Sequence, residues 1–153
     1  MSKASAGLLL YRFKTKSLEV LLVHPGGPYW MNKDDGAWSI PKGEFSFDED
    51  PLEAAKREFE EETSFQIDGN FRKLEAIKQK GGKTVFAWAV EGNLDVSQAV
   101  SNLFTIEWPP NSGKQQTFPE VDKVRWFSIS AARAKINTNQ IALLDELKLI
   151  LIQ

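Results

Sequence analysis

The sequence contains 153 residues, of which 42% are hydrophobic and 26% are charged, a balance typical of a globular protein. Its length predicts one domain spanning residues 1–153. The chain has no Cys and a single His, which excludes disulfides and thiolate metal sites and argues against a Ser–His catalytic unit. A net charge of −2 gives no support for a nucleic-acid partner. The N-terminal apolar stretch is too short for a signal peptide, and no run has membrane-spanning length, so we expect a cytoplasmic protein with no membrane partner.

The first part of the chain predicts a β-hairpin followed by a loop. Residues 6–13 and 18–24 are short apolar runs separated by a polar turn. Residues 25–36 are rich in Gly and Pro, which predicts a loop, and they carry Tyr29 and Trp30.

Residues 51–63 predict the clearest helix of the chain. Asp50 is a suitable N-cap, Pro51 suits the first helical position, and Glu53 completes a capping-box arrangement with Asp50. These signals mark where the helix begins.

Strands dominate the middle of the chain. Residues 71–79 and 84–91 predict a hairpin around Gly81-Gly82, and because both faces of 84–91 are apolar we expect it to be a central strand. The remaining expected elements are a strand at 103–108, a loop to Phe118, a strand at 124–128 and helices at 130–136 and 140–151. This order predicts an α/β fold in which a mixed β-sheet lies between helices, an α/β/α sandwich.

Three carboxylates, Glu58, Glu61 and Glu62, gather beside the apolar stripe of the 51–63 helix. That stripe consists of Leu52, Ala55 and Phe59. Like charges at positions i and i+4 repel by about 0.3 kcal/mol per exposed pair, so the cluster does not stabilise the helix. A divalent cation would remove the repulsion, and carboxylate oxygens on a rigid element suit Mg²⁺ or Mn²⁺. The alternative interpretation is a solvated acidic helix face.

The segment 43–65 resembles the Nudix box, whose pattern is Gly, five residues, Glu, seven residues, then Arg-Glu-apolar-any-Glu-Glu-any-Gly-apolar. Gly43, Glu49 and residues 57–65 match every position except the last Gly, which is Ser64. The family Gly favours a left-handed backbone where the helix ends, so Ser64 in that conformation would cost on the order of 1 kcal/mol. The charged positions all remain, and we expect metal binding to be retained. The resemblance also implies the α/β/α sandwich.

The resemblance assigns a role to each charged position. It implies that Glu58, Glu61 and Glu62 bind Mg²⁺ or Mn²⁺ together with a backbone carbonyl near Gly43, whereas Glu49 and Arg57 orient and balance these ligands. In this family the general base is either a Glu of the box or a Glu on a distant loop. The candidates for the catalytic base are therefore Glu58 and Glu61 in the box and Glu120 outside it.

Substrate-binding candidates lie outside the helix. Lys42 precedes the box glycine and is expected to contact phosphate, and Arg12 is a further candidate for the phosphate tail. Tyr29 and Trp30 are expected to stack on a nucleobase. Trp38 is expected to belong to the core.

The approach to the box, Pro-Lys-Gly, resembles the branch of the family that hydrolyses dinucleoside polyphosphates such as diadenosine tetraphosphate, and its nucleoside triphosphate relatives. We therefore expect a nucleotide substrate, with a nucleoside triphosphate pyrophosphatase as the alternative enzyme. A non-catalytic domain that senses a nucleotide is the alternative outside catalysis, although it would not need all three carboxylates. The 140–151 helix has more apolar surface than one face requires, so it docks either on the sheet or on a second chain in a homodimer.

Overall fold

The computed structural model of the protein describes residues 4–79 and 81–151. Its strands are β1 (Ala4–Lys14), β2 (Ser17–Pro25), β3 (Lys42–Glu44), β4 (Arg72–Lys73), β5 (Ile77–Lys78), β6 (Thr84–Glu91), β7 (Leu103–Glu107), β8 (Gln115–Pro119) and β9 (Val121–Ser128). The helices are α1 (Pro51–Thr63), α2 (Ile129–Lys135) and α3 (Ile141–Leu151), with short 3₁₀ turns at Val96–Gln98 and Thr138–Gln140.

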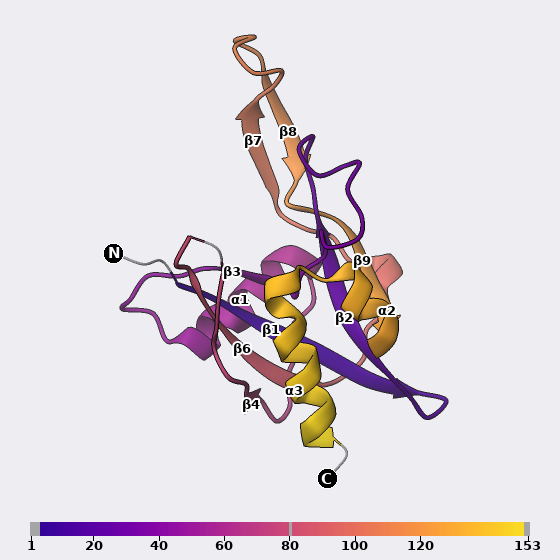
Figure 1. Cartoon of the computed structure of the whole chain (residues 1–153). Coiled ribbons are helices and arrows are strands. Elements are labelled where there is room, and N and C mark those ends of the chain that lie inside the picture. Colours follow the sequence, from indigo (N-terminus) through magenta and orange to yellow (C-terminus); the bar gives the residue numbers. More distant parts are fainter. Residues whose placement is uncertain (1–3, 80, 152–153) are drawn as a thin grey trace.

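Most strands form one mixed sheet in the order β4-β6-β1-β2-β9, with β3 added beside β1 and β5 beside β6 (Figure 1). The β1–β6 pair is parallel and the other pairs are antiparallel. The expected hairpin at the start of the chain is confirmed as β1 and β2. The expectation that 84–91 is an interior strand is also confirmed, because β6 has partners on both sides.

Helices cover both faces of this sheet, which confirms the α/β/α sandwich. On one face, Ala54, Ala55 and Phe59 of α1 are buried in the same cluster as side chains of β1 and β2. On the other face, Leu143, Leu144 and Leu147 of α3 are fully buried with Trp38 and residues of β1 and β2. The last helix therefore docks on the sheet. Among the described residues, no helix is long and apolar enough to cross a membrane.

Two parts of the sequence-based prediction were wrong in detail. The expected strand 71–79 is broken into β4 and β5. The expected loop before Phe118 contains β8, which pairs with β7 in a separate two-stranded sheet that projects from the body (Figure 1). Hydrophobic alternation does not reveal β8 because its residues are mostly exposed and begin with two Gln.

Both ends of α1 follow from local chemistry. The side chain of Asp50 accepts a hydrogen bond from the backbone N–H of Glu53 at 3.0 Å, which confirms the predicted N-cap. At the other end, Ser64 adopts a left-handed conformation with φ of 68°, and its N–H donates to the carbonyl of Glu60. Ser64 therefore stops the helix as a glycine would, at the expected cost of about 1 kcal/mol.

Candidate active site

The residues before α1 lie against the helix because β3 pairs with β1. Gly7 permits this close approach, since a Cβ there would lie 2.5 Å from the carbonyl oxygen of Pro41. Gly43 in turn lies against the carboxylate of Glu58, and a Cβ at Gly43 would be 1.8 Å from Glu58 Oε1. The backbone at Lys42–Gly43 and the carboxylates of α1 therefore share one site, where only glycine fits at position 43.

Arg57 connects three of the four carboxylates at the fixed positions of the box. Its Nε and Nη2 donate to the two carboxylate oxygens of Glu49 at 2.9 and 3.1 Å, a bidentate pair. Its Nη1 donates to Glu58 Oε2 at 2.7 Å and to Glu61 at 3.3 Å. The guanidinium thus neutralises part of the cluster and orients Glu58, whose side chain is only 11% exposed.

Three carboxylates of the site, the buried Glu58 and the half-buried Glu62 and Glu120, have raised pKa values. Burial, followed by repulsion from Glu61, raises the pKa of Glu58 to about 7. Burial, followed by repulsion from Glu58, raises the pKa of Glu62 to about 8. Burial also raises the pKa of Glu120, with a further contribution from Glu61. These carboxylates repel one another in a partly dehydrated site, which is an environment that a divalent cation would stabilise.

No group of three or more His, Cys, Asp or Glu side chains within residues 4–79 and 81–151 is arranged to hold a metal ion. The residue types nevertheless fit a hard cation. Glu58 and Glu62 supply hard oxygen donors, and Gly43 leaves room for Glu58 beside the backbone. The repulsion between these carboxylates gives a reason for a cation to bind there.

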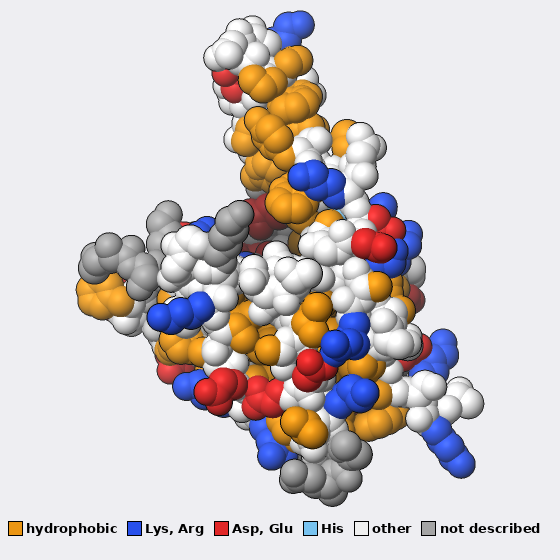
Figure 2. All heavy atoms as spheres, viewed as in Figure 1, with side chains coloured by type: hydrophobic (Ala, Val, Ile, Leu, Met, Phe, Trp, Pro, Cys, Tyr) orange, Lys and Arg blue, Asp and Glu red, His pale blue; other side chains and the backbone are white. Residues whose placement is uncertain are grey.

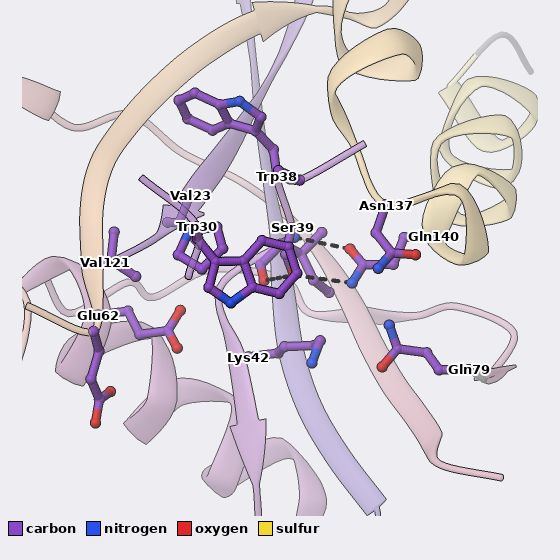
Figure 3. A pocket seen from close by; sticks show the side chains of 14 residues that line it. Val23, Trp30, Trp38, Ser39, Lys42, Glu62, Gln79, Val121, Asn137 and Gln140 are labelled. Atoms are coloured by element: carbon purple, nitrogen blue, oxygen red, sulfur yellow. Dashed lines mark hydrogen bonds between the residues drawn. The ribbon is translucent and has the colours of Figure 1, made fainter. Parts of the chain in front are cut away.

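A cleft opens beside the carboxylates, with a volume of about 210 Å³ (Figure 3). It is lined by Val23, Pro25, Trp30, Ala37, Trp38, Ser39, Ile40, Lys42, Glu62, Gln79, Glu120, Val121, Asn137 and Gln140. One end is therefore charged and the other is aromatic and amide-rich, an arrangement that suits a ligand with a phosphate part and a planar part.

Lys42 and Glu120 both lie in this cleft. Burial lowers the pKa of Lys42, while the nearby charge of Glu62 opposes that shift. Glu120 directly follows β8, far from the box in sequence, but the structure brings it near Glu61 and Glu62. The cleft therefore brings together Lys42, which is expected to contact phosphate, and Glu120, the candidate base outside the box.

Of the other predicted substrate-binding residues, one lies at the cleft and two do not. Trp30 lines the cleft and is 40% exposed. Tyr29 does not line it, since its ring packs edge-on against Trp108 at 5.1 Å. Arg12 lies elsewhere, where its guanidinium pairs with Glu19 and stacks 4.0 Å from the ring centroid of Trp126. The structure thus brings Trp30 to the site and leaves Tyr29 and Arg12 outside it.

The sequence prediction missed the amide side chains of the cleft. Gln140 is fully buried, accepts a hydrogen bond from the N–H of Ile40 at 3.0 Å and donates to Ser39 Oγ at 3.0 Å (Figure 3). Asn137 and Gln79 complete this wall. Their positions come from the packing of the 137–140 turn and β5 on the cleft, and no local sequence signal marks them.

Two other side chains near the cleft have structural roles. His24 is buried, with Nδ1 2.7 Å from Asp122 Oδ1 and Nε2 2.6 Å from the carbonyl of Lys33. Trp38 is 2% exposed and donates from Nε1 to Asp34 at 2.8 Å, which confirms its predicted place in the core. Both ring nitrogens of His24 are occupied, so neither is free to act on a substrate.

The mixed α/β/α fold places the acidic helix α1 beside a cleft that Lys42, Glu62 and Glu120 line. A family model described as NUDIX domain matches residues 1–147, and the chain therefore belongs to the Nudix family of pyrophosphohydrolases. No curated protein matches the sequence at a significant level.

Solved structures agree with this assignment of the fold. A C. elegans Ap4A hydrolase in a binary complex is 23% identical with a TM-score of 0.66, and the match covers 98% of each chain. The NUDIX domain of Shewanella oneidensis NrtR, complexed with ADP ribose, is 15% identical with a TM-score of 0.68, over 99% of this chain and 89% of that one. A mutT/nudix family protein from Listeria innocua is 16% identical with a TM-score of 0.65, over 98% and 94% of the two chains.

Proposed function

We propose that the protein hydrolyses a phosphoanhydride bond in a nucleoside-diphosphate-linked substrate of the dinucleoside polyphosphate type, with Mg²⁺ or Mn²⁺ as cofactor. The observation that carries this proposal is a pair of mutually repelling carboxylates, the buried Glu58 and the half-buried Glu62. Glu62 lines a cleft that also contains Lys42 and Trp30.

Glu58, Glu61 and Glu62 would hold the metal, assisted by the backbone carbonyl at Gly43. When bound, the metal would offset charge on the phosphate oxygens and help to ionise the attacking water. Arg57 and Glu49 keep Glu58 in place through the bidentate contact between them. Glu58, Glu61 and Glu120 are the candidates for the base that accepts the proton of that water.

Lys42 and Trp30 would bind opposite parts of the substrate. The Lys42 side chain is half-buried near Glu62, so its ammonium group would contact the phosphate nearest the carboxylates. The indole of Trp30 lies in the middle of the cleft, with Asn137 and Gln140 to one side (Figure 3), and its ring would offer a nucleobase a surface for stacking. Stacking against Trp30 would orient the base.

The length of the phosphate chain is proposed from likeness to relatives. The Ap4A hydrolase of C. elegans resembles the chain over its whole length, which supports a dinucleoside polyphosphate. The ADP ribose in the NrtR complex supports a second candidate, a smaller nucleoside diphosphate derivative that this chain would cut or only bind. Lys42, Glu62 and Trp30 would serve both substrates.

A hydrolysis screen tests the proposal. Diadenosine polyphosphates, nucleoside triphosphates, ADP-ribose and capped RNA are incubated with the protein and Mg²⁺ or Mn²⁺. We expect diadenosine polyphosphates to be cut, with loss of activity in Glu61→Gln and near-normal activity in Glu60→Gln, whose side chain is exposed on the same helix. Binding of nucleotides without any hydrolysis would replace the enzyme by a nucleotide-sensing domain.

A further inference from the structure

The hairpin of β7 and β8, residues 103–119 and here termed the arm, projects from the body next to the loop that follows β2 (Figure 1). Apolar side chains gather along it (Figure 2). A two-stranded hairpin is only marginally stable by itself in water, so the arm requires contacts with the rest of the protein.

Backbone hydrogen bonds fasten the base of the arm between two parts of the site. The N–H of Asn102 donates to the carbonyl of Glu61 in α1 at 2.8 Å, and the N–H of Glu120 donates to the carbonyl of Asn102 at 2.8 Å. The N–H of Gly26 then donates to the carbonyl of Glu120 at 2.9 Å. The arm therefore links the carboxylate helix to the 25–31 loop.

The apolar face of the arm packs on the same loop. A Cβ at Gly27 would lie 2.8 Å from Phe104 Cζ, so the loop backbone lies directly against that ring. Further out, the rings of Tyr29 and Trp108 meet edge to face at 5.1 Å. Phe118 pairs with Phe104 across the arm, and the centroids of their rings lie 6.0 Å apart. Phe118 therefore packs beside the ring that contacts Gly27.

Trp30, the next residue after Tyr29, lines the cleft. The N–H of Trp30 donates to the carbonyl of Gly27 at 3.2 Å and closes a turn over residues 27–30. This turn begins at Gly27, the residue against which Phe104 packs. We propose that Phe104 and Trp108 are positioning residues that hold the 25–31 loop against the arm with Trp30 over the cleft. In this way the arm sets the affinity for the nucleoside end of the substrate. This inference rests on the proposed function, because it requires that Trp30 binds a nucleobase.

AMP and Mn²⁺ binding, each measured by calorimetry, test the proposal. Because an edge-to-face aromatic pair contributes modestly, we expect Trp108→Ala to weaken AMP binding about fivefold, with unchanged Mn²⁺ affinity. Trp108→Phe retains a ring and should restore AMP affinity. The matched control is Leu103→Ala, since Leu103 is 65% exposed on the opposite face of the arm and should bind AMP normally. With a cleaved nucleotide, Trp108→Ala should raise KM and leave kcat unchanged.

A double mutant separates positioning from general damage. If Trp108 acts through Trp30, then Trp108→Ala should not weaken AMP binding further in a Trp30→Ala background. Additive losses would overturn the proposal, as would an equal loss of Mn²⁺ affinity in Trp108→Ala. A change in oligomeric state with unchanged AMP affinity would overturn it in favour of an interface role for the arm.

The outcome for wild-type protein distinguishes this proposal from the proposed function. If wild-type protein binds AMP and Trp108→Ala binds it equally well, only the positioning role of the arm is overturned. If wild-type protein cleaves no diadenosine polyphosphate and binds no nucleoside monophosphate, the proposed function is overturned together with the positioning role. If it cleaves the substrate but binds no nucleoside monophosphate, only the positioning role is overturned.

Discussion

Replacing Glu62 by Gln should stabilise the metal-free protein. Burial and the charge of Glu58 raise the pKa of Glu62 to about 8, so the folded state holds a proton that the unfolded state, at the ordinary value of 4.5, has released. A raised carboxyl pKa contributes stability that is fully present below pH 4.5 and is lost as the pH rises through about 8. Gln keeps the size of the side chain and removes the charge.

The magnitude follows from the same pKa. The pKa of Glu62 rises from 4.5 to about 8 on folding. At about 1.4 kcal/mol per pKa unit, its ionisation lowers the free energy of unfolding by at most about 5 kcal/mol. Part of this repulsion is shared with Glu58, and water reaches Glu62 from the cleft, so we expect a gain of about 2 kcal/mol at pH 8.5. For a chain of this length that gain raises Tm by about 4–8 °C.

Thermal unfolding in EDTA, followed by circular dichroism, provides the assay. The Tm of Glu62→Gln and wild type should differ little at pH 4.5 and diverge progressively up to pH 8.5. Glu60→Gln is the control, because Glu60 is exposed on the same helix and lies outside the cleft. The reasoning is refuted if Glu62→Gln gains the same stability at both pH values, or if Glu60→Gln gains as much.

Three further predictions concern the same helix and its flanks. Mn²⁺ should raise the Tm of the wild type more at pH 8 than at pH 6, because its carboxylate ligands must lose their protons to bind it; scanning calorimetry at both pH values would show this. Gly43→Ala would place a Cβ 1.8 Å from Glu58 Oε1, so titration should show Mn²⁺ affinity reduced by about tenfold or more. Gly36→Ala is strained by its φ of 79°, at a cost of about 1 kcal/mol, but its Cβ meets nothing within 4 Å, so it should bind Mn²⁺ normally. Ser64→Gly relieves a φ of 68°, so urea unfolding should show a gain of about 1 kcal/mol, with unchanged kcat.

The charged end of the site was predictable because its determinants are local. The N-cap of α1 depends on Asp50 and a residue three positions later, and Glu58, Glu61 and Glu62 occupy neighbouring positions on one helix. The apolar stripe that docks α1 on the sheet also places these carboxylates at its edge. The helical period alone therefore determines that Glu58 is buried and that Glu61 and Glu62 lie beside it.

The arm was not predictable in the same way. Its strand β8 is mostly exposed, so neither an apolar run nor strict alternation marks it. Tyr29 was expected at the cleft with Trp30, but pairing with Trp108 turns it toward the arm. The same limit applies to Arg12, whose partners Glu19 and Trp126 belong to two other strands.

The cleft as a whole combines segments that are distant in sequence. Trp30 comes from the loop after β2, Lys42 begins β3, and Gln140 reaches Ile40 from the turn before α3. The sequence marks Lys42 through the neighbouring box glycine and Trp30 through its loop, but nothing local marks Gln140, which is placed by contacts between elements. Chemistry that depends on the carboxylate helix should therefore tolerate changes in the arm, while affinity for the base should respond to them. This separation is the reason that Mn²⁺ and AMP affinities are measured together in the arm variants.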